Sequence, residues 1–213
     1  MKKTIYLFSA SIALLSMSIP SLAQESAPKF GIKGGLNLSN MYEGEVKKSE
    51  MLLGYNVGLF AKVPVTSFIS FQPEVYLTTK GSKTTYNTVL LDGTASFRLT
   101  YIEVPLLCVV NVTPVINLQF GPYVAYMIDG SVKNKSNVSL FDYEENINTN
   151  DYNRIDAGVA IGAGFDMGAV SIGVRYNLGL TKVGKTQTIG GTEYTVPNSC
   201  NNVVSAYIAL SIN

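Results

Sequence analysis

The chain has 213 residues, enough for one domain, and its 16 basic and 15 acidic side chains nearly balance. That balance argues against nucleic acid or an anionic surface as a partner. Histidine and tryptophan are absent, whereas glycine occurs 19 times and tyrosine 13 times. Because few stretches have a helical period, the composition and pattern predict an all-β protein.

The first 23 residues have the layout of a secretory signal peptide. Lys2 and Lys3 precede an apolar stretch from about Ile5 to Ile19, and Ser21-Leu22-Ala23 places small residues before a cleavage site. A retained membrane anchor is the alternative, but the apolar stretch is too short to span a bilayer comfortably. Cleavage after Ala23 would lower the basic count from 16 to 14 against 15 acidic residues, a net charge near −1.

Alternation of apolar and polar residues with period 2 recurs eight times after the predicted cleavage site, which predicts eight strands. The segments are 30–38, 53–62, 69–78, 101–110, 116–129, 154–165, 170–178 and 203–212, each about ten residues long. Short turns are expected at 64–66, 112–114 and 167–168, and long polar loops at 39–52, 81–96, 130–151 and 181–202. This strict alternation of short and long connections predicts an eight-stranded antiparallel up-and-down barrel.

The phase of the alternation indicates which face of the barrel is wet. The apolar set is bulky and nearly unbroken, whereas the polar set is rich in glycine and carries few charges, of both signs. A soluble barrel would have an outer coat rich in Lys and Glu, and small residues with paired charges suit the crowded interior of an eight-stranded barrel. We therefore expect a transmembrane barrel with its apolar face in lipid. The charges expected inside are Lys33, Glu74, Glu103, Arg154, Asp156 and Arg175.

Several single residues carry further expectations. Glu103 should pair with Arg175, Arg154 or Lys33, because an unpaired buried carboxylate is costly. Proline cannot donate to a ladder, so the prolines within strands predict bulges or missing hydrogen bonds; they are Pro73, Pro105 and Pro122. Cys108 lies in an apolar strand and Cys200 in a polar loop, so we do not expect them to pair.

Three motifs that suggest chemistry have simpler interpretations. "GLTKVGKT", residues 179–186, fits the phosphate-loop pattern, but no helical period follows it. The acidic loop at 142–151 lacks the fixed spacing and glycine of a dedicated calcium site. A serine nucleophile activated by histidine is excluded, because the chain has no histidine. We expect no catalytic residue, no bound metal and no cofactor.

Five stretches, in order, resemble the PorT-type outer-membrane β-barrel proteins of Bacteroidetes-like bacteria, which are small barrels of the OmpA/OmpX kind. The stretches are "FGIKGGLNLSNM", "SFQPEVYLTTKGSK", "TYIEVPLLCVV", "LQFGPYVAYMI" and "DAGVAIGAGFDMGAVSIGVRYNLGLTKV". The resemblance implies a barrel that the general barrel-assembly machinery inserts into the outer membrane, usually with no assigned function. The final strand departs from the usual assembly signal, because it ends in Asn213 and not in an aromatic residue.

These inferences predict a signal peptide at 1–23, a short periplasmic tail at 24–29 and an outer-membrane barrel at 30–213. Because side chains fill the interior of an eight-stranded barrel, a general diffusion pore is not expected. The predicted function is a non-enzymatic membrane anchor that displays four surface loops to a surface or envelope partner, or that supports an outer-membrane assembly. The alternatives are a soluble periplasmic barrel that binds an apolar ligand and a narrow selective channel.

Overall fold

The computed structural model of the protein describes residues 27–42, 50–87, 92–136, 143–184, 186–189, 192–195 and 199–212. The predicted signal peptide and the first half of the predicted tail, residues 24–26, lie outside this set. The strands are β1 (Lys29–Tyr42), β2 (Glu50–Pro64), β3 (Ile69–Asn87), β4 (Asp92–Asn111), β5 (Ile116–Ser136), β6 (Tyr143–Asn146), β7 (Ile155–Met167), β8 (Val170–Lys182), β9 (Thr186–Ile189), β10 (Thr192–Thr195) and β11 (Cys200–Ile212). A 3₁₀ turn, η2 (Thr149–Asp151), precedes β7.

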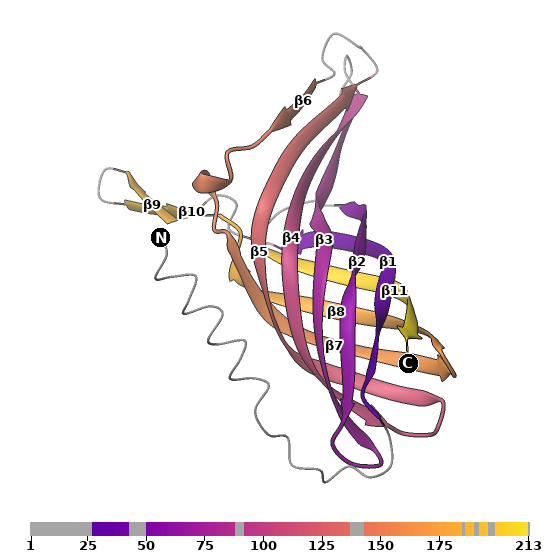
Figure 1. The fold of residues 1–213 in the computed structure, drawn as a ribbon. Helices are drawn as coiled ribbons and strands as arrows, with labels where there is room; N and C mark the ends of the chain where they lie inside the picture. Colours follow the sequence, from indigo (N-terminus) through magenta and orange to yellow (C-terminus); the bar gives the residue numbers. More distant parts are fainter. Residues whose placement is uncertain are drawn as a thin grey trace, which may run out of the picture.

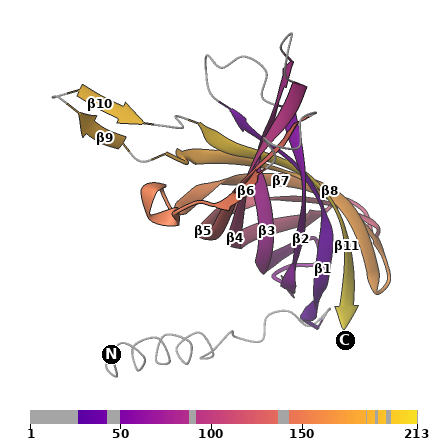
Figure 2. The same ribbon diagram turned by 90° about the horizontal axis from the view of Figure 1, so that it is seen from above.

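Eight of these strands form a closed antiparallel ring in the order β1-β2-β3-β4-β5-β7-β8-β11 (Figures 1 and 2). The first and last strands pair along thirteen positions, from Phe30 opposite Ile212 to Tyr42 opposite Cys200, and so close the ring. Strand β6 adds to the far end of β5, while β9 and β10 form a separate hairpin. The predicted eight-stranded antiparallel up-and-down barrel is therefore confirmed. No helix in the described part of the chain is long and apolar enough to cross a membrane.

The two ends of the barrel differ in their connections. The three short turns, β2–β3, β4–β5 and β7–β8, lie where they were predicted, at the end that also holds the start of β1 and the end of β11; we call this the turn end. The opposite end, which carries the long connections, is the loop end. Figure 1 shows β3, β4 and β5 extending past the other strands at the loop end.

The predicted lengths of strands and loops need correction. The ring strands have 13 to 21 residues instead of about ten. Residues 81–96, expected to be a loop, mostly continue β3 and β4, which remain paired as far as Asn87 opposite Asp92. The added parts of the two strands include Thr84, Thr85, Tyr86 and Thr94, whose residue types favour strands, and each added pair satisfies further backbone groups.

The alternation of exposed and buried side chains follows the predicted phase. On the outer face, Leu36, Val159 and Ile172 are 61%, 46% and 43% exposed. On the inner face, Glu74 and Lys80 are each 1% exposed. Apolar residues therefore cover the outside of the ring and polar residues fill much of its interior, the reverse of a soluble protein.

The prolines interrupt the ladders without shifting their register. Between β3 and β4 the pairing passes directly from Pro73 to Tyr76, with Pro105 opposite the gap, and the register is the same on both sides. The ladder between β4 and β5 has a comparable gap beside Pro122. The predicted interruptions are thus missing pairs, as expected for residues without an N–H, and not bulges. The register shifts in the described part of the ring lie nearer the loop end.

Inward-facing aromatic rings lie over four glycines of neighbouring strands in the described part of the wall. A Cβ on these glycines would lie between 2.4 and 2.8 Å from a ring atom. The directly opposed pairs are Gly31 with Phe60, Gly58 with Tyr76, Gly158 with Tyr123, and Gly173 with Tyr207. The rings can therefore occupy these positions only because the opposing residues have no side chain.

Replacing Gly173 by alanine is expected to destabilise the barrel. The new Cβ would lie 2.5 Å from the carbonyl oxygen of Ala163 and from the ring of Tyr207, so both the backbone and the ring must move. We expect Gly173→Ala to lower the free energy of unfolding by about 1–3 kcal/mol, measured by urea titration in lipid vesicles. Gly34→Ala is the matched control, since its Cβ meets nothing closer than 3.6 Å. Equal unfolding midpoints for the two variants would contradict this account.

Candidate functional site

The interior of the barrel holds two clusters of buried charges, one above the other along the axis. Both include a residue of β3: Glu74 belongs to the cluster nearer the turn end, and Lys80 to the cluster nearer the loop end. Lys80 follows Glu74 by six positions, which corresponds to about 20 Å of extended strand. We name the two groups of charges the Glu74 cluster (Lys33, Glu74, Arg175) and the Lys80 cluster (Lys80, Glu103, Asp156).

In the Glu74 cluster one carboxylate pairs with two cations. Lys33 Nζ donates to Glu74 Oε1 over 3.0 Å, and both terminal nitrogens of Arg175 donate to the same carboxylate, Nη2 over 3.1 Å. Gln72 and the Tyr76 hydroxyl also donate to it. Both carboxylate oxygens of Glu74 are thus used, as a buried anion requires.

Further contacts tie this cluster to the opposite wall. Arg175 Nη2 donates to Gln119 Oε1 over 2.6 Å, and Gln119 Nε2 donates in turn to the Tyr207 hydroxyl over 2.7 Å. The ammonium of Lys33 lies 3.5 Å from the centre of the Tyr207 ring, a cation–π contact. The network therefore crosses the interior from β3 to β5, β8 and β11.

The Lys80 cluster has the opposite composition, with one cation between two carboxylates. Lys80 Nζ lies 2.6 Å from Glu103 Oε2 and 2.8 Å from Asp156 Oδ2. Asn177 donates to the free oxygen of Glu103 over 2.7 Å, and Asn201 donates to Asp156 over 3.3 Å. Two acids from β4 and β7 are therefore held together by a base from β3.

The charges of the two clusters cancel. The Glu74 cluster has two cations and one anion, and the Lys80 cluster one cation and two anions, so their sums are +1 and −1. A closed interior without net charge avoids the large desolvation cost of an uncompensated ion. Between the clusters lies a void of only about 20 Å³, room for about one or two water molecules.

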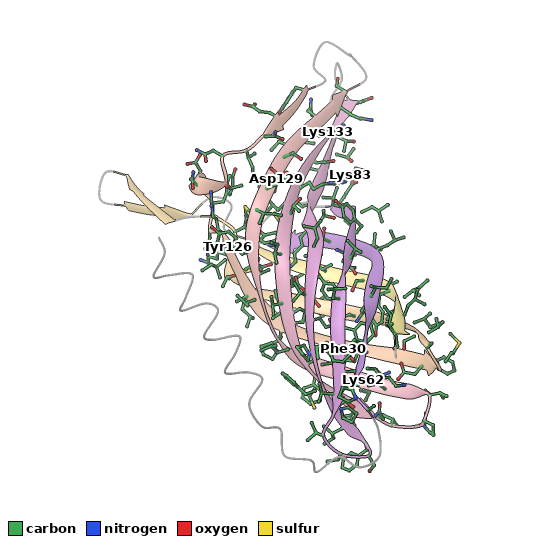
Figure 3. The ribbon with its side chains drawn as sticks, in the orientation of Figure 1. Phe30, Lys62, Lys83, Tyr126, Asp129 and Lys133 are labelled. Carbon is green, nitrogen blue, oxygen red and sulfur yellow. The ribbon has the colours of Figure 1, made fainter. Side chains whose placement is uncertain are left out.

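The two ends of the interior differ in polarity and in access from outside. At the turn end a cavity of about 600 Å³ opens outward, and Lys62 lines it, paired with Asp166 over 3.1 Å. Figure 3 shows Lys62 at this end, below most of the barrel wall. At the loop end the inward residues become apolar: Leu99 and Met127 are fully buried there. The charged middle is thus closed toward the loop end and separated from the turn-end cavity by the Glu74 cluster.

The structure places five of the six predicted interior charges inside the barrel. Three of them form the Glu74 cluster and two belong to the Lys80 cluster. Their exposed fractions are at most 5%: Lys33 3%, Glu74 1%, Glu103 3%, Asp156 2% and Arg175 5%. The partner expected for Glu103 was wrong, because Lys80 takes that role, and not Arg175, Arg154 or Lys33. Lys80 was overlooked because the third predicted strand ended at residue 78, although Lys80 continues the inward phase of Glu74.

Arg154, the sixth predicted interior charge, lies elsewhere. It precedes β7 by one residue, where the chain leaves η2, so the alternation of the strand does not direct its side chain inward. Its guanidinium donates to Thr149 Oγ1 over 2.7 Å, to Asn150 Oδ1 over 2.8 Å and to the hydroxyl of the outward-facing Tyr126 over 3.0 Å. Arg154 therefore fastens the η2 turn to the outside of the barrel.

The interior offers little for catalysis. The three buried carboxylates are occupied by bases and amides, and the sequence has no histidine to activate a nucleophile. Among the residues described, no three side chains suited to metal binding come together. Cys108 and Cys200 are both free. The phosphate-loop match begins in β8 and ends at Thr186 in β9, so the helix that such a loop requires does not follow it.

The sequence decides what kind of barrel this is. A family model described as "Outer membrane protein beta-barrel domain" matches residues 22–184, more than half of the chain. The chain belongs to this family. No curated protein matches the sequence.

Three outer-membrane proteins are among the solved structures that match this chain. Neisserial surface protein A has a TM-score of 0.50 at 14% identity, and the similarity covers 88% of this chain and all of that one. Ail of Yersinia pestis, solved with the heparin analogue sucrose octasulfate, has a TM-score of 0.47 at 15% identity, with the same coverage. The outer membrane enzyme PagL has a TM-score of 0.33 at 13% identity, covering 87% and 100%. The likeness to Neisserial surface protein A concerns the fold alone.

Family and fold together locate the protein. It is a small integral β-barrel protein of the bacterial outer membrane, and its apolar outer face contacts lipid. The buried charge clusters are therefore the filling of an outer-membrane barrel. They account for how a narrow barrel tolerates so many ionisable groups, since each ion has a partner of opposite sign.

Removing the single base of the Lys80 cluster should strongly destabilise this outer-membrane barrel. Lys80→Met leaves Glu103 and Asp156 buried without a cation, and we expect a loss of about 3–5 kcal/mol in the free energy of unfolding in vesicles. Lys83→Met is the matched control: its partner Glu50 is 3.4 Å away at the surface, so the loss should be about 1 kcal/mol or less. Adding Glu103→Gln to Lys80→Met should restore part of the stability. Equal losses for Lys80→Met and Lys83→Met would refute the role assigned to the cluster.

Proposed function

We propose that the protein is a non-enzymatic membrane anchor that presents its loop end to a partner at the cell surface. The observation that carries this proposal is the filled interior: two ion clusters and an apolar layer occupy the barrel from the turn-end cavity to the loop end. A barrel with such an interior has no room for general solute passage. Function is then left to the surfaces at the two ends.

The loop end is the better candidate for the interacting surface. In outer-membrane barrels the short turns face the periplasm and the longer loops face outward. Here β3, β4 and β5 continue beyond the other strands and β6 extends this sheet, so a paired sheet projects from the barrel (Figure 1). Lys83 and Lys133 lie on this projecting part (Figure 3). Such a platform supports binding to a surface or envelope protein better than the uncharged short turns do.

A narrow selective channel is the second candidate, and the turn-end cavity favours it. That cavity of about 600 Å³ is lined by both polar and apolar residues, with Lys62 and Asp166 among them, and opens outward. Farther in, the voids shrink to about 30 and 20 Å³, and the ions beside them are held by several hydrogen bonds. The anchor proposal is therefore preferred. Discrete conductance steps of the wild-type protein in a planar bilayer would favour the channel instead.

The route of the protein to the membrane follows from the sequence features. Residues 1–23 act as a signal peptide in this proposal, residues 24–29 form a short periplasmic tail, and the general barrel-assembly machinery inserts the barrel from residue 30 onward. The ordered stretches that resemble PorT-type proteins support a place in that subgroup of the family.

The proposed processing predicts the start of the mature chain. Because cleavage is expected after Ala23, intact-mass measurement and N-terminal sequencing of protein from outer membranes should show a chain that begins at Gln24. Ala23→Arg should block cleavage, since a small residue is needed at that position, and Ser26→Arg, beyond the cleavage site, is its control. A wild-type chain that still begins at Met1 would disprove the signal-peptide assignment.

Photo-crosslinking tests the proposed interacting surface. A benzoylphenylalanine at the exposed position of Thr84 or Lys135, at the loop end, should give one discrete adduct on illumination of intact cells. The matched control positions, Ser67 and Thr113, are also exposed, lie in the short turns and should not give that adduct. Adducts from the turn positions alone would place the partner at the turn end and refute the proposal.

A further inference from the structure

The lipid-facing wall of the barrel is interrupted by an apolar groove of about 640 Å³. The groove crosses neighbouring strands from β1 over β11, β8 and β7 to the start of β5. Four strand-to-strand steps correspond to a length of roughly 20 Å. Residues that line it include Leu36, Ala163, Phe165, Ile172, Ala206 and Ile208.

The register of the strands explains why a groove forms there. One row of directly opposed outward residues contains Ala206, Val174 and Ala163. The adjacent row toward the turn end contains Ile208, Ile172 and Phe165, and the adjacent row toward the loop end contains Val204, Tyr176 and Ile161. Ala206 and Ala163 flank Val174 in the first row, and Leu36 and Leu118 lie at the ends of that row. The two small side chains therefore leave hollows on either side of Val174, beside the row of Ile208, Ile172 and Phe165.

The groove extends toward the turn end of the membrane-spanning wall. Ile116 is the first residue of β5, Phe165 lies two residues before the end of β7, and Ile172 lies two residues after the start of β8. No charged side chain lines it. Whatever fills the groove must therefore be apolar and must come from the half of the bilayer next to the short turns.

We propose that this groove is a binding site for one acyl chain of a phospholipid from the leaflet at the turn end. The groove continues the lipid-contacting surface of the barrel, so lipid reaches it without a separate entry path. In lipid, affinity for a groove comes from close packing and not from escape from water, because the surrounding tails are equally apolar. The Ile, Phe, Leu and Val side chains that line the groove offer a chain lateral contacts in addition to the contacts with Ala163 and Ala206.

A second copy of the chain fits this surface less well. In a two-fold symmetric dimer the same patch meets itself, so the contact must be self-complementary. A groove placed against its own copy encloses a void, which forfeits the packing contacts that hold membrane proteins together. The groove therefore favours a flexible chain over a second barrel.

Filling the groove tests the proposal. The double variant Ala163→Leu/Ala206→Leu places two larger side chains in the groove, and the control Ala61→Leu/Ala157→Leu adds the same atoms to the outer face outside it. Native mass spectrometry of protein released from bilayers of phosphatidylethanolamine should show one retained phospholipid on the wild type and on the control. We expect about a tenfold loss of this species in the groove variant, corresponding to about 1.4 kcal/mol. Equal retention by both variants would overturn the proposal. The proposal would also be overturned if the wild type and the control formed a dimer that the groove variant did not form.

A second measurement on the wild type covers the case in which a variant does not fold. Phosphatidylethanolamine with a photoactivatable diazirine in its acyl chain should label peptides that contain Ala163 and Ala206 in preference to other outward-facing segments. Labelling spread evenly around the wall would show that lipid passes over the groove without a preferred site, and would refute the proposal.

Discussion

The closure of the sheet by the ladder between β1 and β11 is the interaction on which the rest of the molecule depends. Lipid offers no partners to backbone N–H and C=O groups, so a sheet that crosses a membrane must leave no open edge. Thirteen paired positions join the two ends of the chain into one wall. Closure also creates an interior that water cannot freely enter, and the polar faces of eight strands must then satisfy one another inside it.

The interior meets this demand by charge balance and by shape. Two ion clusters of opposite net charge occupy the middle, and aromatic rings lie over glycines of the neighbouring strands. Because the bases and acids come from β1, β3, β4, β7 and β8, each ion pair also holds separate parts of the wall together. The same filling removes the space that transport would need, which is why the exposed loop end carries the proposed function.

Much of the barrel could be predicted from the sequence because its signals are local. The period of two, the short turns and the phase of the apolar residues depend only on neighbours along the chain. Lys33, Glu74 and Arg175 could be assigned to the interior in the same way. Arg154 was misplaced because it lies just outside the strand, where the chain turns and alternation no longer applies. The extension of β3 to Asn87 was missed because the polar outer end of a strand has the same kind of composition as a loop.

The sequence by itself determined the number of strands in the ring, their order along the chain and the face of each ring strand that meets lipid, since all three follow from the spacing of apolar residues. Only the tertiary structure decided which ions meet. Glu103 pairs with Lys80, and Glu74 with both Lys33 and Arg175, because the stagger between strands sets which side chains share a level inside the barrel. That stagger arises when the ring closes, and it is a property of all eight strands together. The groove on the outer wall has the same origin, because Ala163 and Ala206 become neighbours of one row only through this register.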